Sequence, residues 1–188
     1  MIARRNMKLS IADYIKELES VVCTEETEGS IMQIVDLIKE LKKNGKRLWV
    51  LGNGGSLAIA QHFAQDLLKM YGVRAQALNC PSVITAYAND NGFQDAQASA
   101  LGILRDQGDV IVIFSCSGSS RNYIDIVTGG EMKPIIGIVG TDGGFIKEHA
   151  DICVHVKSDN YATCETAFSL IADLISFELE EIEHYAKN

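Results

Sequence analysis

Arg47–Ser56 reads RLWVLGNGGS, a short apolar run that passes into a glycine-rich turn. A helical pattern of apolar residues begins directly after it. The glycines let the backbone approach a ligand closely, and the first amides of a helix carry a partial positive charge. The stretch therefore predicts a strand, a helix and an anion site between them, although an ordinary strand-to-helix turn would look similar. It matches neither GxGxxG nor the Walker sequence, so we expect no nucleotide.

A second loop has the same order of parts. The apolar run VIVIF leads into Ser115-Cys116-Ser117-Gly118-Ser119-Ser120, and a helical segment follows. Capping that helix would need only one serine, and the loop has four. Several hydroxyl groups and a glycine at the end of a strand suit the oxygens of a phosphate group. We predict that this loop binds the phosphate of a small ligand.

Short apolar runs alternate with helical segments along most of the chain. Runs such as VIVIF and IIGIV lack polar alternation, as expected for parallel strands covered on both faces. The pattern predicts an α/β fold, a doubly wound parallel sheet with its ligand beyond the carboxyl ends of the strands, at the switch point. The expected strands are Arg47–Leu51, Arg74–Leu78, Val110–Ser115, Ile135–Val139 and Ile152–Val156. Helical stretches are expected to begin near Ser56, Ser82, Ser119 and Gly144.

Two amphipathic helices precede the sheet, with predicted starts at Ser10 and Ser30 and a stop at Gly45. We expect residues 1–45 to serve packing or oligomerisation and residues 46–188 to bind the ligand, within one structural domain. A last helix, from about Thr163 to Tyr185, carries apolar side chains on nearly every face. Such a helix is normally buried on all sides, so we predict a homo-oligomer.

Composition narrows the class of protein. The 188 residues carry a net charge of -8, and the 17 basic residues are scattered, which argues against a nucleic-acid partner. The five cysteines form an odd set without CxxC spacing, as in a protein of a reducing compartment. No signal peptide or apolar run long enough to span a membrane is evident. We expect a cytoplasmic protein without a membrane partner.

In order along the chain, these motifs resemble those of the sugar isomerase (SIS) fold and, more closely, the phosphoheptose isomerases. The similarity runs over about residues 30–180 and includes GNGGS, His62-Phe63-Ala64, Ala88-Asn89-Asp90, the SCSGSS loop and GTDGG at 140–144. It implies a five-stranded parallel sheet flanked by helices, assembled as a tetramer with sites at subunit boundaries. It also implies conversion of sedoheptulose 7-phosphate to D-glycero-D-manno-heptose 7-phosphate, for bacterial lipopolysaccharide or capsule synthesis.

The resemblance also implies a set of substrate-binding residues. They come from both loops, from the Asn-Asp pair and from two helices: Asn53, Gly54, Gly55, Ser56, Asp66, Asn89, Asp90, Ser115, Cys116, Ser117, Ser120 and Glu165. Cys116 stands where the family usually has a threonine, which removes a good hydrogen-bond partner.

The catalytic positions depart from the family pattern. Asp66 replaces a glutamate, Asp173 an essential histidine, Phe168 a second histidine and Glu165 a glutamine. We expect Asp66 and Asp173 to be the pair that transfers protons. Aspartate is shorter than glutamate by a methylene, and a misplacement of about an ångström can cost about a hundredfold in rate. Its ordinary pKa of about 3.9, against about 6.5 for histidine, makes it a poorer proton donor at neutral pH unless burial raises it.

A metal site is a second prediction for these positions. Some family members bind zinc at the positions of His62, Asp66, Glu165 and Asp173. One nitrogen and three carboxylates favour manganese or magnesium over zinc. Glu165 and Asp173 would lie about 12 Å apart along one helix. We therefore expect that Glu165 precedes the helix or that the two residues serve different subunits' sites.

Other readings of the same residues stay open. The three carboxylates would be solvated helix charges if they bound nothing, and His62 would be a hydrogen-bonded core residue. A non-catalytic SIS protein would bind a sugar phosphate or a protein partner, like the family's replication-initiator-binding branch. A related isomerase or epimerase would act on a different sugar phosphate with an oxygen-rich metal site.

Overall fold

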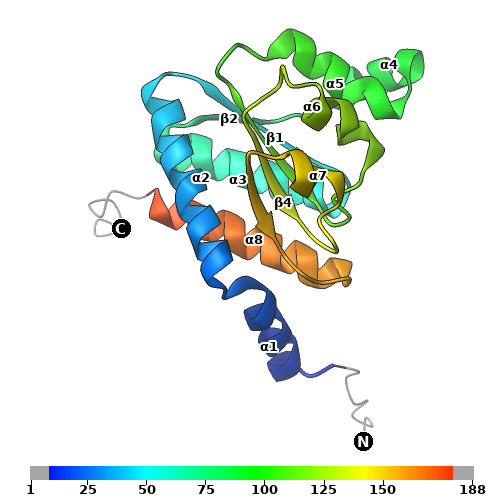
Figure 1. Ribbon diagram of the computed structural model, residues 1–188. Helices are drawn as coiled ribbons and strands as arrows, with labels where there is room; N and C mark the ends of the chain where they lie inside the picture. The colour runs from blue at the N-terminus through cyan, green and yellow to red at the C-terminus, as the bar shows by residue number, and fades with distance from the viewer. Residues whose placement is uncertain (1–8, 180–188) are drawn as a thin grey trace, which may run out of the picture.

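Five parallel strands form one sheet in the order β2-β1-β3-β4-β5 (Figure 1). The computed structural model describes residues 9–179. The strands are β1 (Arg47–Gly52), β2 (Arg74–Ala77), β3 (Val110–Ser115), β4 (Ile135–Val139) and β5 (Ile152–His155). The predicted doubly wound parallel sheet is confirmed, and each strand begins at its predicted residue.

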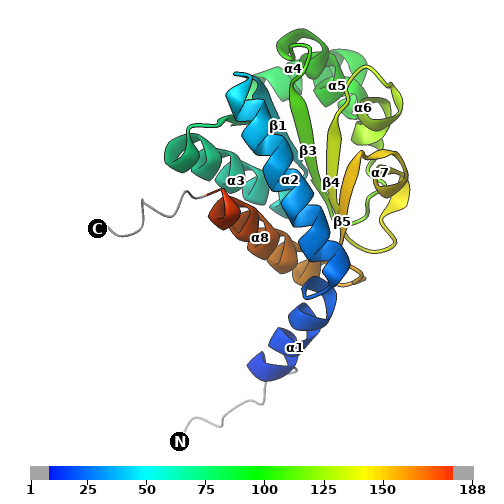
Figure 2. The ribbon, with the colours of Figure 1, turned by 60° about the vertical axis from the view of Figure 1, so that its left-hand side comes forward.

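Helices cover both faces of the sheet (Figures 1 and 2). One face carries α2 (Glu25–Lys43), α3 (Gly55–Tyr71) and α8 (Tyr161–Glu178). The other carries α4 (Pro81–Asn91), α5 (Phe93–Leu104), a 3-10 turn η1 (Arg121–Tyr123), α6 (Ile124–Thr128) and α7 (Gly144–His149). The first helix, α1 (Ile11–Val22), stands out from the body and contacts the beginning of α8.

The core lies in two layers, one on each side of the sheet. Every residue of β3 is buried, as the unbroken run VIVIF predicts. Val112 and Phe114 pack toward α2, α3 and α8, whereas Ile111 and Ile113 pack toward α5, α6 and α7. Because successive side chains of a strand point to opposite faces, one apolar run contributes to both layers.

Asp109 ties the beginning of β1 to the segment that leads into β3. Its buried carboxylate accepts hydrogen bonds from the backbone amides of Arg47 and Asp106 and from the Trp49 indole, at 2.8, 3.1 and 3.1 Å. Burial by itself would raise the pKa of Asp109, but these donors and the Arg47 charge outweigh it and lower the pKa. The ionised carboxylate therefore aligns the two strands whose far ends carry the predicted ligand loops.

The two N-terminal helices agree only in part with the prediction. Ser10 caps α1, and its side chain accepts a hydrogen bond from the Asp13 amide at 3.1 Å. The predicted start of α2 at Ser30 is wrong, because the helix begins at Glu25 under a Thr24 cap. Ser30 lies inside the helix and donates to the carbonyl of Cys153 on β5 at 3.0 Å, which anchors α2 to the sheet.

Two further helix boundaries differ from the prediction. The segment expected to begin near Ser82 is two helices, because Gly92 adopts a φ of 89° between them. The helix expected near Ser119 begins as η1 and continues as α6. The last helix begins at Tyr161, and its predicted end at Tyr185 lies outside the described residues. Among the described helices, none is both long and apolar enough to cross a bilayer.

Candidate functional site

A pocket of about 310 Å³ lies at the carboxyl edge of the sheet, between the loops that follow β1 and β3. This is the switch point, because β1 connects onward to β2 on one side and β3 connects to β4 on the other. The pocket is lined by Asn53, Gly54, Gly55, Ser56, Phe114, Ser115, Cys116, Ser117, Ser120, Tyr161 and Glu165. The structure thus brings together nine of the residues that the sequence suggested for substrate binding.

The first loop presents the beginning of α3 to the pocket. Gly54 occupies the N-cap position with a φ of 55°, and no described side chain caps the helix. The first amides of α3 are therefore available to an anion, and the dipole of this 17-residue helix favours one. A side chain at Gly52 would collide with the backbone of Ser56, so the tight turn requires glycine there.

The second loop is attached by backbone hydrogen bonds to the segment after β4. The Gly140 amide donates to the Ser115 carbonyl and the Ile146 amide donates to the Gly118 carbonyl, both at 3.1 Å. The Ser115 and Ser120 hydroxyl oxygens lie 3.5 Å apart, and the Ser115 hydroxyl also accepts from the Gly118 amide at 3.2 Å. Two hydroxyl groups so close together, at the end of a strand, can contact neighbouring oxygens of one phosphate.

Cys116 contributes a neutral group to the pocket wall. Burial raises the pKa of its thiol to about 11, and the Ser56 hydroxyl, 3.9 Å from the sulfur, only partly offsets this. The thiol is thus protonated at neutral pH and is a weak hydrogen-bond partner for a ligand rather than a nucleophile.

Glu165 lies against the beginning of α3. A Cβ atom added to Gly55 would collide with the Glu165 carboxylate, which shows how closely this half-buried side chain covers the glycine. Glu165 sits inside α8, which excludes the expectation that it precedes the helix. The pocket therefore contains a carboxylate beside the amides that favour an anion.

A second cluster lies farther along the same two helices. His62 and Asp66 of α3 and Asp173 of α8 each offer a ligand atom, and the three atoms lie within 4.8 Å of one another. The His62 Nε2 and Asp66 Oδ2 atoms are 3.4 Å apart. His62 and Asp173 are exposed and Asp66 is half-buried. We call these three residues the acidic cluster.

The acidic cluster fits a divalent ion with positions left open. Its three donors, one imidazole nitrogen and two carboxylates, are of the kinds that zinc and manganese accept. Glu165 belongs to the pocket and is not part of this group, so three of the four predicted metal ligands come together in one chain.

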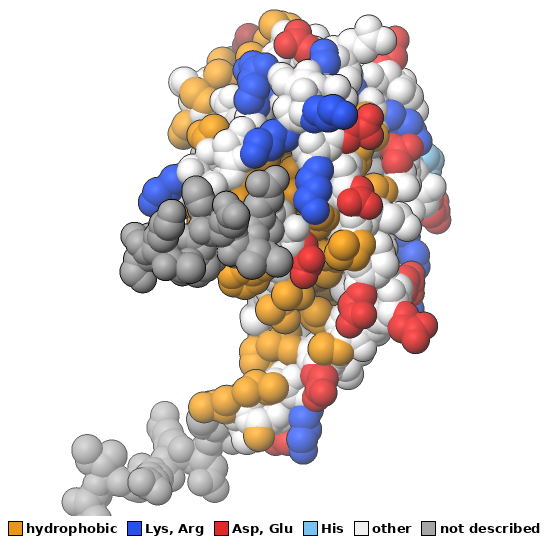
Figure 3. All heavy atoms as spheres, turned by 90° about the vertical axis from the view of Figure 1, so that its left-hand side faces the viewer, with side chains coloured by type: hydrophobic (Ala, Val, Ile, Leu, Met, Phe, Trp, Pro, Cys, Tyr) orange, Lys and Arg blue, Asp and Glu red, His pale blue; other side chains and the backbone are white. Residues whose placement is uncertain are grey.

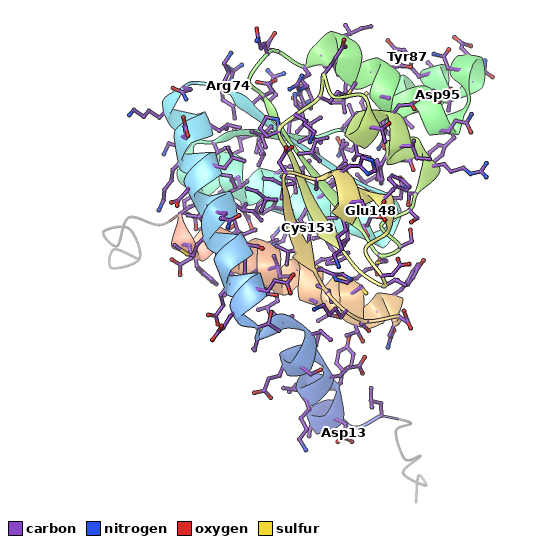
Figure 4. The ribbon with its side chains drawn as sticks, in the orientation of Figure 1. Asp13, Arg74, Tyr87, Asp95, Glu148 and Cys153 are labelled. Atoms are coloured by element: carbon purple, nitrogen blue, oxygen red, sulfur yellow. The ribbon has the colours of Figure 1, made fainter. Side chains whose placement is uncertain are left out.

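Asn89 and Asp90 do not line the pocket. Both are exposed on α4, where the Asn89 amide donates to the Asp90 carboxylate at 2.9 Å. Tyr87 on α4 and Asp95 on α5 lie at one end of the molecule, and Asp13 on α1 lies at the other (Figure 4). Within one chain, Asn89 and Asp90 are thus separate from the residues that line the pocket.

Sequence reasoning missed two kinds of residue. Tyr161 lines the pocket from the first turn of α8, but no motif marks it. Asn122 and Gln97 are buried behind the pocket and form hydrogen bonds with each other and, through Asn122, with Asn53. Their polar character inside apolar surroundings is a signal that only the fold reveals.

Comparison with known proteins agrees with this arrangement. The SIS domain family matches residues 12–139. A phosphoheptose isomerase from Geotalea daltonii is 34% identical over 185 residues, which cover 92% of this chain and 95% of that protein. A phosphoheptose isomerase from Akkermansia muciniphila is 33% identical over 192 residues, with 96% of each chain covered. The chain belongs to the phosphoheptose isomerase family. It is therefore an isomerase-type enzyme with the SIS fold.

Solved phosphoheptose isomerases have the same fold as this family member. The structure from Francisella tularensis superposes with a TM-score of 0.82 at 27% identity and covers 89% of this chain and 92% of that one. The structure from Neisseria gonorrhoeae gives 0.81 at 29% identity, with 90% and 94% covered. The five-stranded sheet and its flanking helices are thus those of the phosphoheptose isomerases.

Proposed function

We propose that this protein is a ketose–aldose isomerase that converts sedoheptulose 7-phosphate to D-glycero-D-manno-heptose 7-phosphate. The observation that carries the proposal is the pocket at the switch point, where the uncapped start of α3 faces the hydroxyl groups of the second loop. The names of the relatives from Geotalea daltonii and Akkermansia muciniphila support the choice of substrate. An aldoheptose phosphate suits the synthesis of bacterial surface polysaccharides.

The phosphate group binds between the two loops in this proposal. Ser115, Ser117 and Ser120 donate hydrogen bonds to its oxygens, and the first amides of α3 add donors and positive potential. The side-chain amide of Asn53 forms hydrogen bonds with the hydroxyl groups of the sugar. The proposal is supported by the fact that these residues all line the pocket.

Asp66 and Asp173 transfer the protons of the reaction. One carboxylate removes a proton from the carbon beside the carbonyl, which leaves an enediol, and the proton returns to the neighbouring carbon. The other carboxyl group exchanges a proton with the two oxygens, so that the net change is ketose to aldose. Their ligand atoms lie within 4.8 Å of each other, a separation that two adjacent carbons can bridge.

The separation between pocket and acidic cluster favours a long substrate. Glu165 at the pocket and Asp173 in the cluster are eight residues apart on α8, about 12 Å along the helix. A phosphate ester of a short sugar would leave its reacting carbons near the loops. An extended seven-carbon chain with its phosphate at the far end places C1 and C2 toward the cluster.

A divalent metal held by His62, Asp66 and Asp173 is part of the proposal. Such an ion would polarise the substrate's carbonyl and hydroxyl oxygens. The oxygen-rich donor set favours manganese or magnesium, whereas the family resemblance favours zinc.

We further propose that the protein forms a homotetramer whose binding sites lie at the subunit boundaries. Hydrophobic side chains gather over α1 and the adjoining part of one face (Figure 3). Ile11 and Ile15 on α1 and Leu170 and Phe177 on α8 are exposed in the single chain. Covering them in an assembly would remove this apolar area from water. Asn89 and Asp90 of one copy would then complete the pocket of another.

We also propose that the protein is located in the cytoplasm. All five cysteines are free thiols, and two of them, Cys116 and Cys164, are buried close to the pocket. Free thiols persist in a reducing compartment.

Replacing Glu165 by glutamine should tighten binding of the sugar phosphate by roughly tenfold, because a negative charge beside a dianion is removed. The gain should shrink at high salt, which screens such repulsion. Isothermal titration calorimetry at low and high ionic strength measures both effects. Glu148→Gln, which removes an exposed carboxylate on α7, is the matched control and should leave the affinity unchanged. Weaker binding by Glu165→Gln would mean that this carboxylate accepts a hydrogen bond from the sugar.

The proposed function is tested by incubating metal-free protein with sedoheptulose 7-phosphate, alone and with added Mn²⁺, Mg²⁺ or Zn²⁺. We expect aldose formation, with a rise in rate when the preferred ion binds the acidic cluster. Elemental analysis of the purified protein and loss of the metal response in His62→Ala provide the check on the ligands. If no ion is bound and none changes the rate, the metal proposal is wrong. Tight binding of the sugar phosphate without turnover under every condition would favour a non-catalytic SIS protein. The replacement of two family histidines by Phe168 and Asp173 is consistent with that alternative.

A further inference from the structure

Asn122 is a buried polar residue at the back of the candidate site. It lies on η1, two residues after Ser120 and thus directly after the hydroxyl-bearing loop. Its side chain is 3% exposed. An amide buried to this extent is stable only when its hydrogen-bonding groups find partners.

The partners of Asn122 come from both sides of the switch point. Its Nδ2 atom donates to Asn53 Oδ1 at 3.1 Å and to Gln97 Oε1 at 2.7 Å, and its Oδ1 atom accepts from Asn53 Nδ2 at 2.9 Å. Asn53 and Asn122 therefore form a reciprocal amide pair, which fixes the plane of the Asn53 amide. Gln97 on α5 is 4% exposed and holds Asn122 from behind.

This network connects the two loops that line the pocket. Asn53 belongs to the loop after β1, and Asn122 follows the loop after β3. Sites work best when the groups that touch the ligand are held in place by a second layer of hydrogen bonds. Without Asn122, the Asn53 side chain could rotate, and Gln97 would bury an unpaired carbonyl oxygen.

We propose that Asn122, supported by Gln97, is a positioning residue that holds the Asn53 amide in the orientation that meets the hydroxyl groups of the sugar. It acts through Asn53 and does not touch the substrate. The proposal rests on the proposed function of the pocket. The phosphate end of the ligand, which the serine hydroxyls and the start of α3 bind, does not depend on it.

The test uses Asn122→Asp, which keeps the size of the side chain but removes both donated hydrogen bonds. We expect kcat/KM for sedoheptulose 7-phosphate to fall about tenfold to a hundredfold, as for a displaced contact group. Affinity for inorganic phosphate should stay at the wild-type value. A merely structural role would weaken both ligands together, in proportion to the loss of folded protein. Equal loss for both ligands, or no loss for either, would overturn the proposal.

A double-mutant cycle with Asn53→Ala makes the test independent of one variant's folding. If Asn122 acts through Asn53, the double variant should be no worse in kcat/KM than Asn53→Ala alone. Additive effects would contradict the proposal. Gln97→Met, which removes only the rear hydrogen bond, should give a smaller loss of the same kind and serves where Asn122→Asp folds poorly. If the wild-type protein shows no turnover, the ratio of sugar-phosphate to inorganic-phosphate affinity replaces kcat/KM, so the inference is judged separately from the isomerase activity.

Discussion

Asp66→Asn is expected to lower kcat for the isomerisation of sedoheptulose 7-phosphate by about a hundredfold to ten-thousandfold. Asparagine has the shape of aspartate but cannot take up or release a proton in the reaction. Asp66 is half-buried, faces His62 at 3.4 Å, and is grouped with Asp173. Initial rates by a coupled assay for the aldose phosphate measure the loss.

Two controls separate chemistry from charge. Asp66→Glu keeps the carboxylate and introduces the longer side chain that the family resemblance assigns to this position. It should keep activity within roughly tenfold of wild type or exceed it. Asp36→Asn removes an exposed carboxylate on α2 and should have no effect. A rate for Asp66→Asn close to that of Asp36→Asn would show that Asp66 carries no proton in the reaction.

Gly118→Ala should produce the second large effect, on both stability and ligand binding. Gly118 has a φ of 60°, and a Cβ atom there would collide with the carbonyl of Gly143. The atoms that the Cβ would strike belong to the backbone of Gly143 and Gly144 and cannot rotate away as a side chain can. The loop between β3 and η1 must therefore shift. We expect a loss of about 3 kcal/mol in the free energy of unfolding, in the range of the larger single-residue effects. We also expect at least a tenfold loss of sugar-phosphate affinity, because the displaced serines no longer converge on one phosphate.

Gly130→Ala is the matched control for the backbone conformation. Gly130 has a similar φ of 68°, but an added Cβ would meet no atom within 4 Å. It should cost only the left-handed conformation itself, about 1 kcal/mol, and leave binding intact. Urea denaturation and calorimetry on both variants make the comparison. Equal losses of stability in the two would mean that the second loop moves aside freely, contrary to the rigid pocket described above.

The sheet and its ligand edge could be predicted because burial on both faces leaves a strong pattern. Runs such as VIVIF have no polar alternation, and each strand of the structure begins where its run begins. The glycines and serines after β1 and β3 marked the pocket because few other residues allow such close approach of the backbone to a ligand. These signals are local, and neighbouring residues in the sequence carry them.

Features that depend on contacts between distant segments could not be predicted. Ser30 resembles a helix cap, but the partner of its hydroxyl is the Cys153 carbonyl of β5. Cys153 lies beside α2 and near α7 in the folded chain (Figure 4). The helix rise already separates Glu165 from Asp173 on α8. That Asp173 lies beside His62 and Asp66 depends on how α3 and α8 pack against each other, which the sequence does not reveal. Asn122 and Gln97 belong to no motif, because their role arises only where η1 and α5 meet.

Proton transfer at the substrate's C1 and C2 inside this site is the central claim, and ¹H NMR of sedoheptulose 7-phosphate with the purified protein in D₂O tests it most directly. The carboxyl group that has taken the proton from carbon exchanges it with D₂O during the lifetime of the enediol and then returns a deuteron to carbon. The account therefore predicts deuterium at these carbons and the appearance of the aldose phosphate. In Asp66→Asn both signals should appear about a hundredfold to ten-thousandfold more slowly, while the sugar phosphate still binds. A wild-type protein that binds the sugar phosphate but leaves these positions fully protonated, with every metal ion tested, would contradict the account.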